Sequence, residues 1–156
     1  ALKKIVLPNS VTIIEDRAFY SCSLLDTIDL PDGLTTIGVD AFWSCSNLKS
    51  IDVSNNVTSI GEGAFTMCSV LPTINIPNNP SFNIIHKNVF YGCSSLTSVT
   101  IPSSVTSIGG KAFYDCSNLT SVVSLRDPAP SIGNMAFGNT HISITLTVPF
   151  NAQGYI

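Results

Sequence analysis

The chain has 156 residues, only 11% of which are charged, and its formal net charge is −3 with seven Lys plus Arg residues. The charged fraction is less than half of the roughly 25% typical of globular proteins, and so few cations argue against a nucleic-acid partner, which requires clustered Lys and Arg. No apolar run approaches the ~20 residues that cross a bilayer, so we expect no membrane insertion.

A repeat of about 23 residues begins at the first residues and continues almost to the end of the chain. A period of this length predicts a solenoid, in which each unit buries its apolar face only by stacking on its neighbours. The leucines of successive units are Leu2, Leu25, Leu48, Leu71, Leu96 and Leu119, and the phenylalanines are Phe19, Phe42, Phe65, Phe90, Phe113 and Phe137.

Two short strands are predicted in each unit, and the fifth unit shows them most clearly. Val99 and Ile101 lie two residues apart among Thr and Ser, which is the period of a half-buried strand. Pro102 ends that strand because it lacks a backbone donor. The segment from Val105 to Ile108 is rich in β-branched residues and predicts a second strand. Since all units run in the same direction, equivalent strands are expected to pair in parallel.

A glycine and a short compact segment complete the unit. The glycines that follow the second strand are predicted to permit a turn: Gly38, Gly61, Gly109 and Gly133. The next six residues, around Ala112 and Phe113, are too few for an independent helix, and we expect one turn of 3₁₀ or α-helix packed on the core.

Three irregularities interrupt the pattern. The fourth unit has two extra residues, best placed in the turn-forming segment 77–81, and it carries His86 and Val89 where Gly and Ala are usual. The last unit has one extra residue in 125–131, and Thr140 replaces the expected Cys. The segment 144–149 is predicted to form a terminal strand that covers the end of the core.

We expect a single domain, with an array of six units in residues 1-149 and the start of a C-terminal capping tail in residues 150-156. The chain opens directly in a strand-like segment, without an initiator Met or a signal peptide. We interpret it as a piece of a longer protein from which the targeting signal has been removed.

The unit Leu-x-x-Ile-x-Leu-Pro-x-x-Val-x-x-Ile-Gly-x-x-Ala-Phe-x-x-Cys closely resembles the BspA-like, treponemal-type class of leucine-rich repeats, over residues 2 to about 149. The resemblance implies a right-handed leucine-rich-repeat solenoid, a β-dominated α/β fold with short parallel strands and 3₁₀ or one-turn helices. It also implies a secreted or surface-displayed bacterial protein that binds proteins or glycoproteins. The shared pattern contains only scaffold residues, so it assigns no binding residue.

Five cysteines form one column of the predicted solenoid: Cys22, Cys45, Cys68, Cys93 and Cys116. Parallel side chains that all point inward do not bring Cβ atoms to the ~3.8 Å of a disulfide. There is no Cys-x-x-Cys pair, and a linear column does not make the tetrahedron that zinc prefers. We therefore predict buried, reduced cysteines that pack as small apolar residues.

Carboxylates and histidines are the remaining chemical candidates. Asp29 and Asp52 hold the same outward strand position in consecutive units, with Asn75 after them, so a row of calcium ligands is one reading. Calcium usually takes six or more oxygens from a wrapped loop, and a solvated polar face is the favoured interpretation. His86 and His141 lie in different units without a nucleophile elbow or phosphate loop. We predict no enzymatic activity and no cofactor.

Two surfaces are candidates for partner binding. Tyr20, Trp43, Tyr91 and Tyr114 each follow a core Phe and would form an aromatic stripe, a residue class enriched at binding hot spots. Alternatively, each ring covers the turn of the neighbouring layer. The second surface is a flat face of small residues along the first strands: Lys4, Thr27, Ser50, Thr73, Ser98 and Ser121.

These observations predict a non-enzymatic, adhesin-like scaffold at a bacterial cell surface that binds a protein or glycoprotein. Two alternatives are a structural spacer that displays another domain and a carbohydrate-binding module that uses the aromatic rings.

Overall fold

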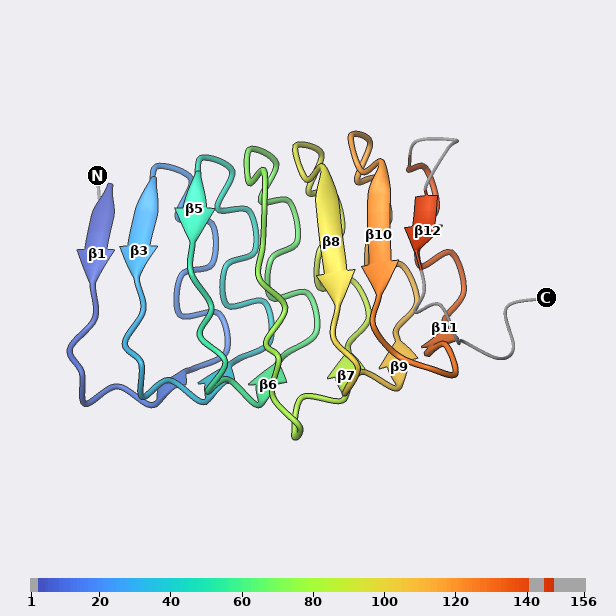
Figure 1. Cartoon of the computed structure of the whole chain (residues 1–156). Helices are drawn as coiled ribbons and strands as arrows, with labels where there is room; N and C mark the ends of the chain where they lie inside the picture. Colours follow the sequence, from blue (N-terminus) through green and yellow to red (C-terminus); the bar gives the residue numbers. More distant parts are fainter. Residues whose placement is uncertain (1–2, 141–144, 148–156) are drawn as a thin grey trace.

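The computed structural model describes residues 3–140 and the strand at 145–147. The chain winds into a solenoid of stacked layers, with β1 at one end of the stack and β12 near the other (Figure 1). Each layer has a first-strand side, a second-strand side and a third side made of turns, which we call the turn side. The layers, numbered 1 to 6, comprise residues 3–24, 25–47, 48–70, 71–95, 96–118 and 119–140.

Parallel strands line two sides of the solenoid, as the repeat predicts. The first strands are β1 (Lys4–Val6), β3 (Thr27–Asp29), β5 (Ser50–Ile51), β8 (Ser98–Ile101), β10 (Ser121–Ser124) and the terminal strand β12 (Thr145–Thr147). The second strands are β2 (Ile13–Ile14), β4 (Thr36–Ile37), β6 (Ser59–Ile60), β7 (Ile84–Ile85), β9 (Ser107–Ile108) and β11 (Ser131–Ile132). β12 pairs with β10, which confirms the predicted terminal strand, whereas the predicted tail at 150–156 lies outside the described residues.

Both strand sides are interrupted at layer 4, which corrects the expectation of continuous parallel pairing. The four sheets have the orders β1-β3-β5, β8-β10-β12, β2-β4-β6 and β7-β9-β11. Among the described residues, 73–76 form no strand and no backbone hydrogen bond to β5 or β8, although Ile74 and Ile76 remain buried. The second-strand side is broken between β6 and β7. The apolar core therefore continues through layer 4 while the hydrogen-bonded ladders do not.

The core consists of columns of identical or similar side chains. Leu25, Leu48, Leu71, Leu96 and Leu119 are each 0% exposed. The phenylalanine rings stack along the axis with centroids 5.1 to 5.7 Å apart, and the rings of Phe42 and Phe65 are within 1° of parallel. Offset-stacked pairs of this kind contribute about 0.5–1.5 kcal/mol beyond the burial of their apolar area. Stacking on neighbouring layers thus provides the apolar burial and ring contacts that a single unit cannot form alone.

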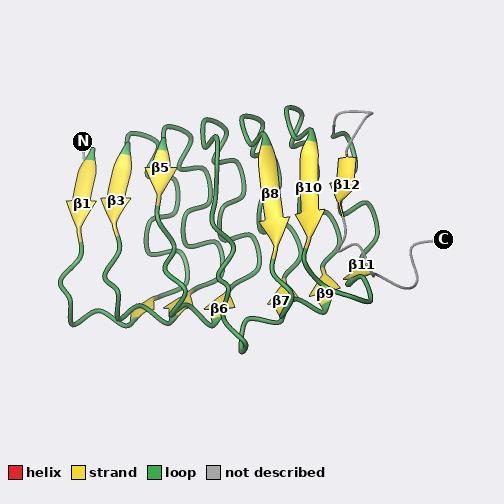
Figure 2. Ribbon diagram, in the orientation of Figure 1, coloured by secondary structure: helices red, strands yellow, loops and turns green. Residues whose placement is uncertain are grey.

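No described residue lies in a helix, so the prediction of a one-turn helix around the core phenylalanines is wrong (Figure 2). Along the turn side, successive backbone amides alternate between two kinds of acceptor. One amide donates to a carbonyl of its own layer, and the next donates to a carbonyl of the following layer. In layer 1, the Tyr20 amide donates to the Arg17 carbonyl at 3.0 Å, whereas the Phe19 amide donates to the Ala41 carbonyl of layer 2 at 2.8 Å. Three such interlayer bonds occur at each of the five junctions between described layers. The turn side is therefore a third ladder.

Two columns of residues with a left-handed backbone conformation explain why the turn side is not helical. Every layer places one residue in each column at a φ between 52° and 70°. The first column is Arg17, Asp40, Gly63, Asn88, Lys111 and Met135, and the second is Ser21, Ser44, Met67, Gly92, Asp115 and Asn139. A side chain in this region costs roughly 1–2 kcal/mol, which the interlayer bonds offset. A helix cannot pass through these residues.

The cysteine column is buried, as predicted, except at the first layer. Cys45, Cys68, Cys93 and Cys116 are each 0% exposed, and Cys22 is half-buried. Each buried thiol donates a hydrogen bond to the carbonyl of the core phenylalanine in the preceding layer, with Sγ to oxygen distances of 3.1 to 3.3 Å. Burial raises the pKa of Cys45 and of Cys116 to about 12, and it raises the pKa of Cys68 and Cys93 well above 9.0. The buried column therefore carries neutral thiols at neutral pH.

This column predicts selective thiol labelling. Because the thiolate is the reactive form, the four buried thiols should resist a disulfide reagent in the native chain at neutral pH, and Cys22 should react first. Counting the thiols released with Ellman's reagent should give a fast phase that disappears in a Cys22→Ala variant, while urea should expose the remaining four. Equal, fast reaction of all the cysteines in the native chain would contradict the burial.

The glycines after the second strands are required by close packing between layers and not by their φ. A Cβ added at Gly61 would lie 2.5 Å from the backbone nitrogen of Val39 in the preceding layer, and one at Gly109 would lie 2.4 Å from that of Lys87. Neither glycine has a positive φ. The layers thus approach so closely at this corner that only glycine fits.

Candidate functional site

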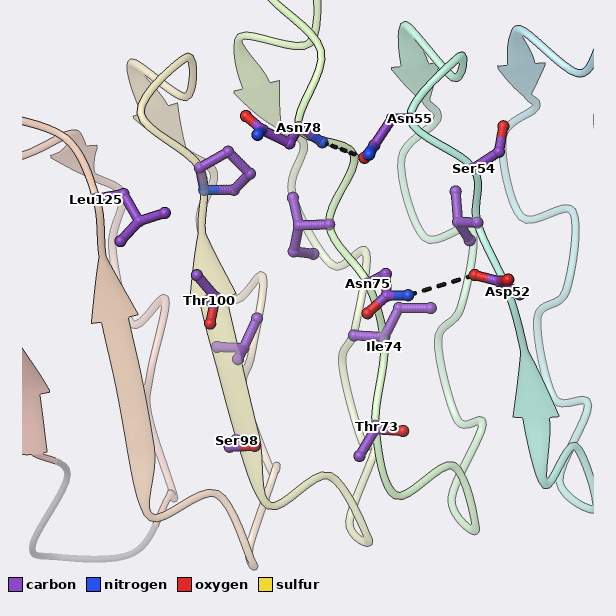
Figure 3. A pocket seen from close by; sticks show the side chains of 14 residues that line it. Asp52, Ser54, Asn55, Thr73, Ile74, Asn75, Asn78, Ser98, Thr100 and Leu125 are labelled. Atoms are coloured by element: carbon purple, nitrogen blue, oxygen red, sulfur yellow. Dashed lines mark hydrogen bonds between the residues drawn. The ribbon is translucent and has the colours of Figure 1, made fainter. Parts of the chain in front are cut away.

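A broad depression lies on the first-strand side, over the interrupted layer 4 (Figure 3). Its volume is about 680 Å³, and we call it the main groove. Layer 3 supplies Asp52 and Asn55, layer 4 supplies the floor at 73–78, and layer 5 supplies Ser98 and Thr100. Leu125 of layer 6, which is 48% exposed, stands at one end. The groove is thus a shallow, mostly polar surface, with buried apolar residues such as Ile74 and Ile76 in its floor and the exposed Leu125 at one end.

Side-chain amides connect layers 3 and 4 where the backbone ladder is missing. The Asn75 amide donates to the Asp52 carboxylate at 3.3 Å. The Asn55 side-chain oxygen accepts a bond from the backbone amide of Asn78 at 2.8 Å, and the Asn55 carbonyl accepts one from the Asn79 side chain at 2.8 Å. Figure 3 shows the first two of these bonds. The groove wall at layer 3 is therefore held by side chains that can exchange partners with a ligand.

A second depression of about 540 Å³ covers the first strands of layers 1 to 3. It contains both carboxylates that the sequence singles out, Asp29 and Asp52. The Asp29 carboxylate lies 3.1 Å from the Lys4 ammonium, and both side chains are more than half exposed. Asp52 borders both depressions. The two depressions make the first-strand side one extended, mostly polar surface.

The carboxylate row is arranged for pairing with neighbours. Asp29 faces a cation, and Asp52 faces an amide. Within residues 3–140, no group of three or more His, Cys, Asp or Glu side chains is placed to hold a metal ion. Both carboxylates therefore pair with side chains of adjacent layers.

The four rings of the aromatic stripe lie on the turn side in two separate pairs. Tyr20 stacks on Trp43 with centroids 6.1 Å apart, and Tyr91 stacks on Tyr114 at 5.3 Å. Thr66, which stands between the pairs in layer 3, is only 1% exposed, and its hydroxyl donates to the Asn88 carbonyl at 2.7 Å. The stripe is thus two local stacks and not one continuous surface.

Most ring faces in these pairs contact the protein. The Arg17 guanidinium lies 6.0 Å from the centre of the Tyr20 ring, and the Lys111 ammonium lies 5.6 Å from that of Tyr114. A Cβ at Gly63 would touch the Trp43 ring at 3.4 Å, and one at Gly138 would lie 2.7 Å from the Tyr114 ring. Trp43 and Tyr114 therefore cover glycines of the next layer, whereas Tyr20 is 47% exposed.

The tyrosine hydroxyls of the second pair lie beside polar side chains of layers 5 and 6. The Tyr114 oxygen accepts a bond from the Asn139 side chain at 2.9 Å, and the same amide donates to Asp115 at 3.0 Å. Lost hydration, and then the nearby Asp115 carboxylate and Tyr114, raise the pKa of Tyr91 above its ordinary 10.0. The Tyr91 hydroxyl is therefore neutral at neutral pH and can donate a hydrogen bond.

Residues of the main groove were only partly indicated by sequence reasoning. Thr73 and Ser98 belong to the predicted flat face, and Asp52 belongs to the carboxylate row. Asn78 and Leu125 lie in the two irregular segments, 77–81 and 125–131, in which the sequence departs from the repeat. Leu125 stands where the fifth unit has Pro102, and this departure from the repeat is the signal that marks it.

The predicted histidines are not brought together by the described structure. His86 is exposed on the second-strand side, directly after β7, and His141 lies outside the described residues. No helix long and apolar enough to cross a membrane occurs among the described residues.

Comparison with solved structures places the fold among bacterial leucine-rich-repeat proteins. A leucine-rich-repeat protein of T. pallidum is 29% identical, with a TM-score of 0.74, and the match covers 94% of this chain and 73% of that one. A leucine-rich cell-surface protein of Faecalibacterium prausnitzii is 30% identical, with a TM-score of 0.64, over 83% of this chain and 40% of that one. A protein of Eubacterium ventriosum shares the fold at 24% identity, with a TM-score of 0.70, over 92% of this chain and 44% of that one. The chain thus spans less than half of the last two proteins.

No curated protein sequence is similar enough to the chain to count as a relative. The model of the BspA-type leucine-rich-repeat region matches residues 1–120 and 83–153, with six copies of the repeat. Leucine-rich repeats of this kind are generally non-enzymatic scaffolds for protein interaction or surface display. Because the matched repeats run through the strands, turns and core columns described above, the chain belongs to the BspA-type leucine-rich-repeat family.

Proposed function

We propose that the chain is a non-enzymatic binding scaffold, displayed at a bacterial cell surface, which contacts a protein partner across the main groove. The observation that carries this proposal is the position of this depression, about 680 Å³, over layer 4, whose first-strand segment pairs with neither neighbouring strand. The exposed residues Thr73, Ser98 and Thr100 line it without any interlayer bond from their side chains. Such side chains are available for recognition because the core does not depend on them.

The chemistry of the groove favours an extended polypeptide segment. Its walls offer amide and hydroxyl groups and a single carboxylate, Asp52, which suit main-chain amides and a Lys or Arg side chain. Leu125 offers an apolar contact at one end. The residues lining the groove include no aromatic ring, which is the usual platform for a sugar. The surface-protein setting of the F. prausnitzii relative supports an extracellular partner.

The carbohydrate alternative would use the aromatic pairs on the turn side. It is less well supported, because the rings stack on one another and on glycines of the next layer. The spacer alternative requires that neither surface bind anything.

One binding experiment separates these functions. The chain should be tested by biolayer interferometry against a panel of purified extracellular-matrix and plasma glycoproteins, each with and without its glycans. A Thr100→Arg change fills the groove, a Ser117→Arg change adds the same charge at an exposed site outside it, and a Trp43→Ala/Tyr91→Ala variant removes the stripe. We expect Thr100→Arg to weaken binding at least about tenfold, as at the centre of an interface, and the other two variants to retain it.

Other outcomes would redirect the proposal. Loss of binding only in the double aromatic variant would move the site to the turn side. Loss on removal of the partner's glycans would favour a carbohydrate-binding module. If no panel protein bound the chain, the spacer role would replace the binding role.

A further inference from the structure

Layer 4 departs from the repeat at three positions that face its neighbours. His86 occupies the glycine column, in which the Cβ of a side chain would lie about 2.5 Å from backbone atoms of the preceding layer, as at Gly61. Real Cβ atoms do not approach so closely. Layers 3 and 4 must therefore stand further apart at the corner of His86 than layers 2 and 3 do at the corner of Gly61.

The other two departures fill the space that this separation creates. Phe82 stands where Val57 and Val105 stand in the adjacent layers, and it is 2% exposed. Val89 stands in the alanine column and is 1% exposed. Larger side chains at both positions keep the core closed while the backbones are spread. Layer 4 therefore acts as a wedge, which means that its larger side chains hold the strand sides of layers 3 and 4 further apart than those of layers 2 and 3.

The bonds across the junction between layers 3 and 4 are correspondingly one-sided. Neither β5 nor β6 pairs with layer 4. On the turn side, by contrast, the amides of Gly63, Phe65 and Met67 donate to carbonyls of layer 4 at 3.2, 2.9 and 2.7 Å. The Phe65 and Phe90 rings across this junction have the longest spacing in the column, 5.7 Å, against 5.1 to 5.3 Å elsewhere.

These features carry a mechanical consequence. Hydrogen-bonded ladders are directional and resist changes in the spacing of layers, whereas apolar contacts are non-directional and tolerate sliding. At this junction the two strand sides keep apolar contacts and a few bonds to and from Asn side chains, and only the turn side keeps its ladder. One further backbone bond, from the Ser95 amide to the Ser69 carbonyl at 3.1 Å, lies at the corner that precedes the first strand.

We propose that the solenoid is two rigid halves, layers 1 to 3 and layers 4 to 6, which rotate about a hinge on the turn side. Opening of the hinge spreads the strand sides and widens the main groove, whose walls belong to different halves. A partner that contacts both walls of the groove would fix the angle between the two halves. The hinge itself does not depend on the proposed function, and it is tested on the free chain.

Distances across the junction test the hinge. Two pairs of exposed residues join the same layers, 1 and 5: Lys4 with Ser98 on the first-strand side, and Arg17 with Lys111 on the turn side. Each pair should be changed to cysteine in a Cys22→Ala background, spin-labelled, and measured by pulsed electron spin resonance. We expect the Lys4–Ser98 distance distribution to be roughly twofold broader than the Arg17–Lys111 distribution, as hinge rotation about the turn side requires.

A repaired layer 4 provides the matched control. Deletion of Asn79 and Pro80, with Pro72→Thr, His86→Gly, Phe82→Val and Val89→Ala, restores the regular unit, and it should narrow the strand-side distribution to that of the turn side. A strand-side distribution that is already narrow in the unrepaired chain, even if its mean is long, would show a fixed wedge and overturn the hinge. Equal broadening of both pairs would overturn the turn-side pivot.

Discussion

Replacing Phe65 with alanine should remove a large part of the stability of the array, because this ring lies in the middle of the continuous stack. Phe65 is 0% exposed and contacts Phe42 and Phe90, with centroids 5.3 and 5.7 Å away. Phe→Ala changes in cores cost about 3–5 kcal/mol, against the roughly 5–15 kcal/mol that stabilises a typical domain. Urea unfolding followed by circular dichroism should therefore show a large fall in the transition midpoint.

Phe19→Ala is the matched control at the end of the same column. Phe19 is only half-buried and stacks on one ring, Phe42, at 5.2 Å. Its removal should cost about half as much, since both the buried area and the number of stacked neighbours are smaller. If the two changes cost the same, stability would not depend on neighbour stacking as the solenoid requires.

The core and the stacking were predictable from the sequence, because they depend on side chains that recur. The Leu, Ile, Phe and Cys columns need only a fixed period and an apolar residue, and both are visible in the repeat. The same reasoning identified the family, since its pattern is a core pattern.

The conformation of the turn side was not predictable in the same way. A one-turn helix was expected around each core phenylalanine, but residues as different as Arg17, Ser21 and Lys111 adopt a positive φ there. Their own propensities do not favour it. Alternate amides bond to the next layer, and this tertiary requirement overrides the local preference for a helix.

The irregularities of layer 4 can be seen in the sequence, but their effect on the strand ladders cannot. The extra residues and the replacement of glycine by His86 can be read directly. Their consequence depends on how closely the layers pass at Gly61, where an added Cβ would lie 2.5 Å from the Val39 nitrogen, and only the structure shows this. Hence the sequence indicated a loop at one edge, whereas the structure has broken ladders on two sides and a groove over the break.

The broken ladders predict a large local difference in backbone hydrogen exchange. Residues 73–76 have no backbone hydrogen bond to a neighbouring strand in the described part of the chain, whereas β10 pairs with β8 on one side and with β12 on the other. Amides in hydrogen-bonded core strands exchange only when the structure opens, which slows them by the opening free energy. An opening free energy near the lower end of typical domain stability corresponds to slowing on the order of a thousandfold or more.

Residue-resolved hydrogen exchange of the free chain, followed by NMR, tests the central claim that layer 4 interrupts the strand ladders while the turn ladder continues. The amides of 73–76 should exchange on the order of a thousandfold faster than those of β10, and the Phe65 and Met67 amides at the same junction should stay protected. Protection of 73–76 equal to that of β10 would show a continuous sheet, and it would contradict the broken ladder from which both the main groove and the hinge are inferred.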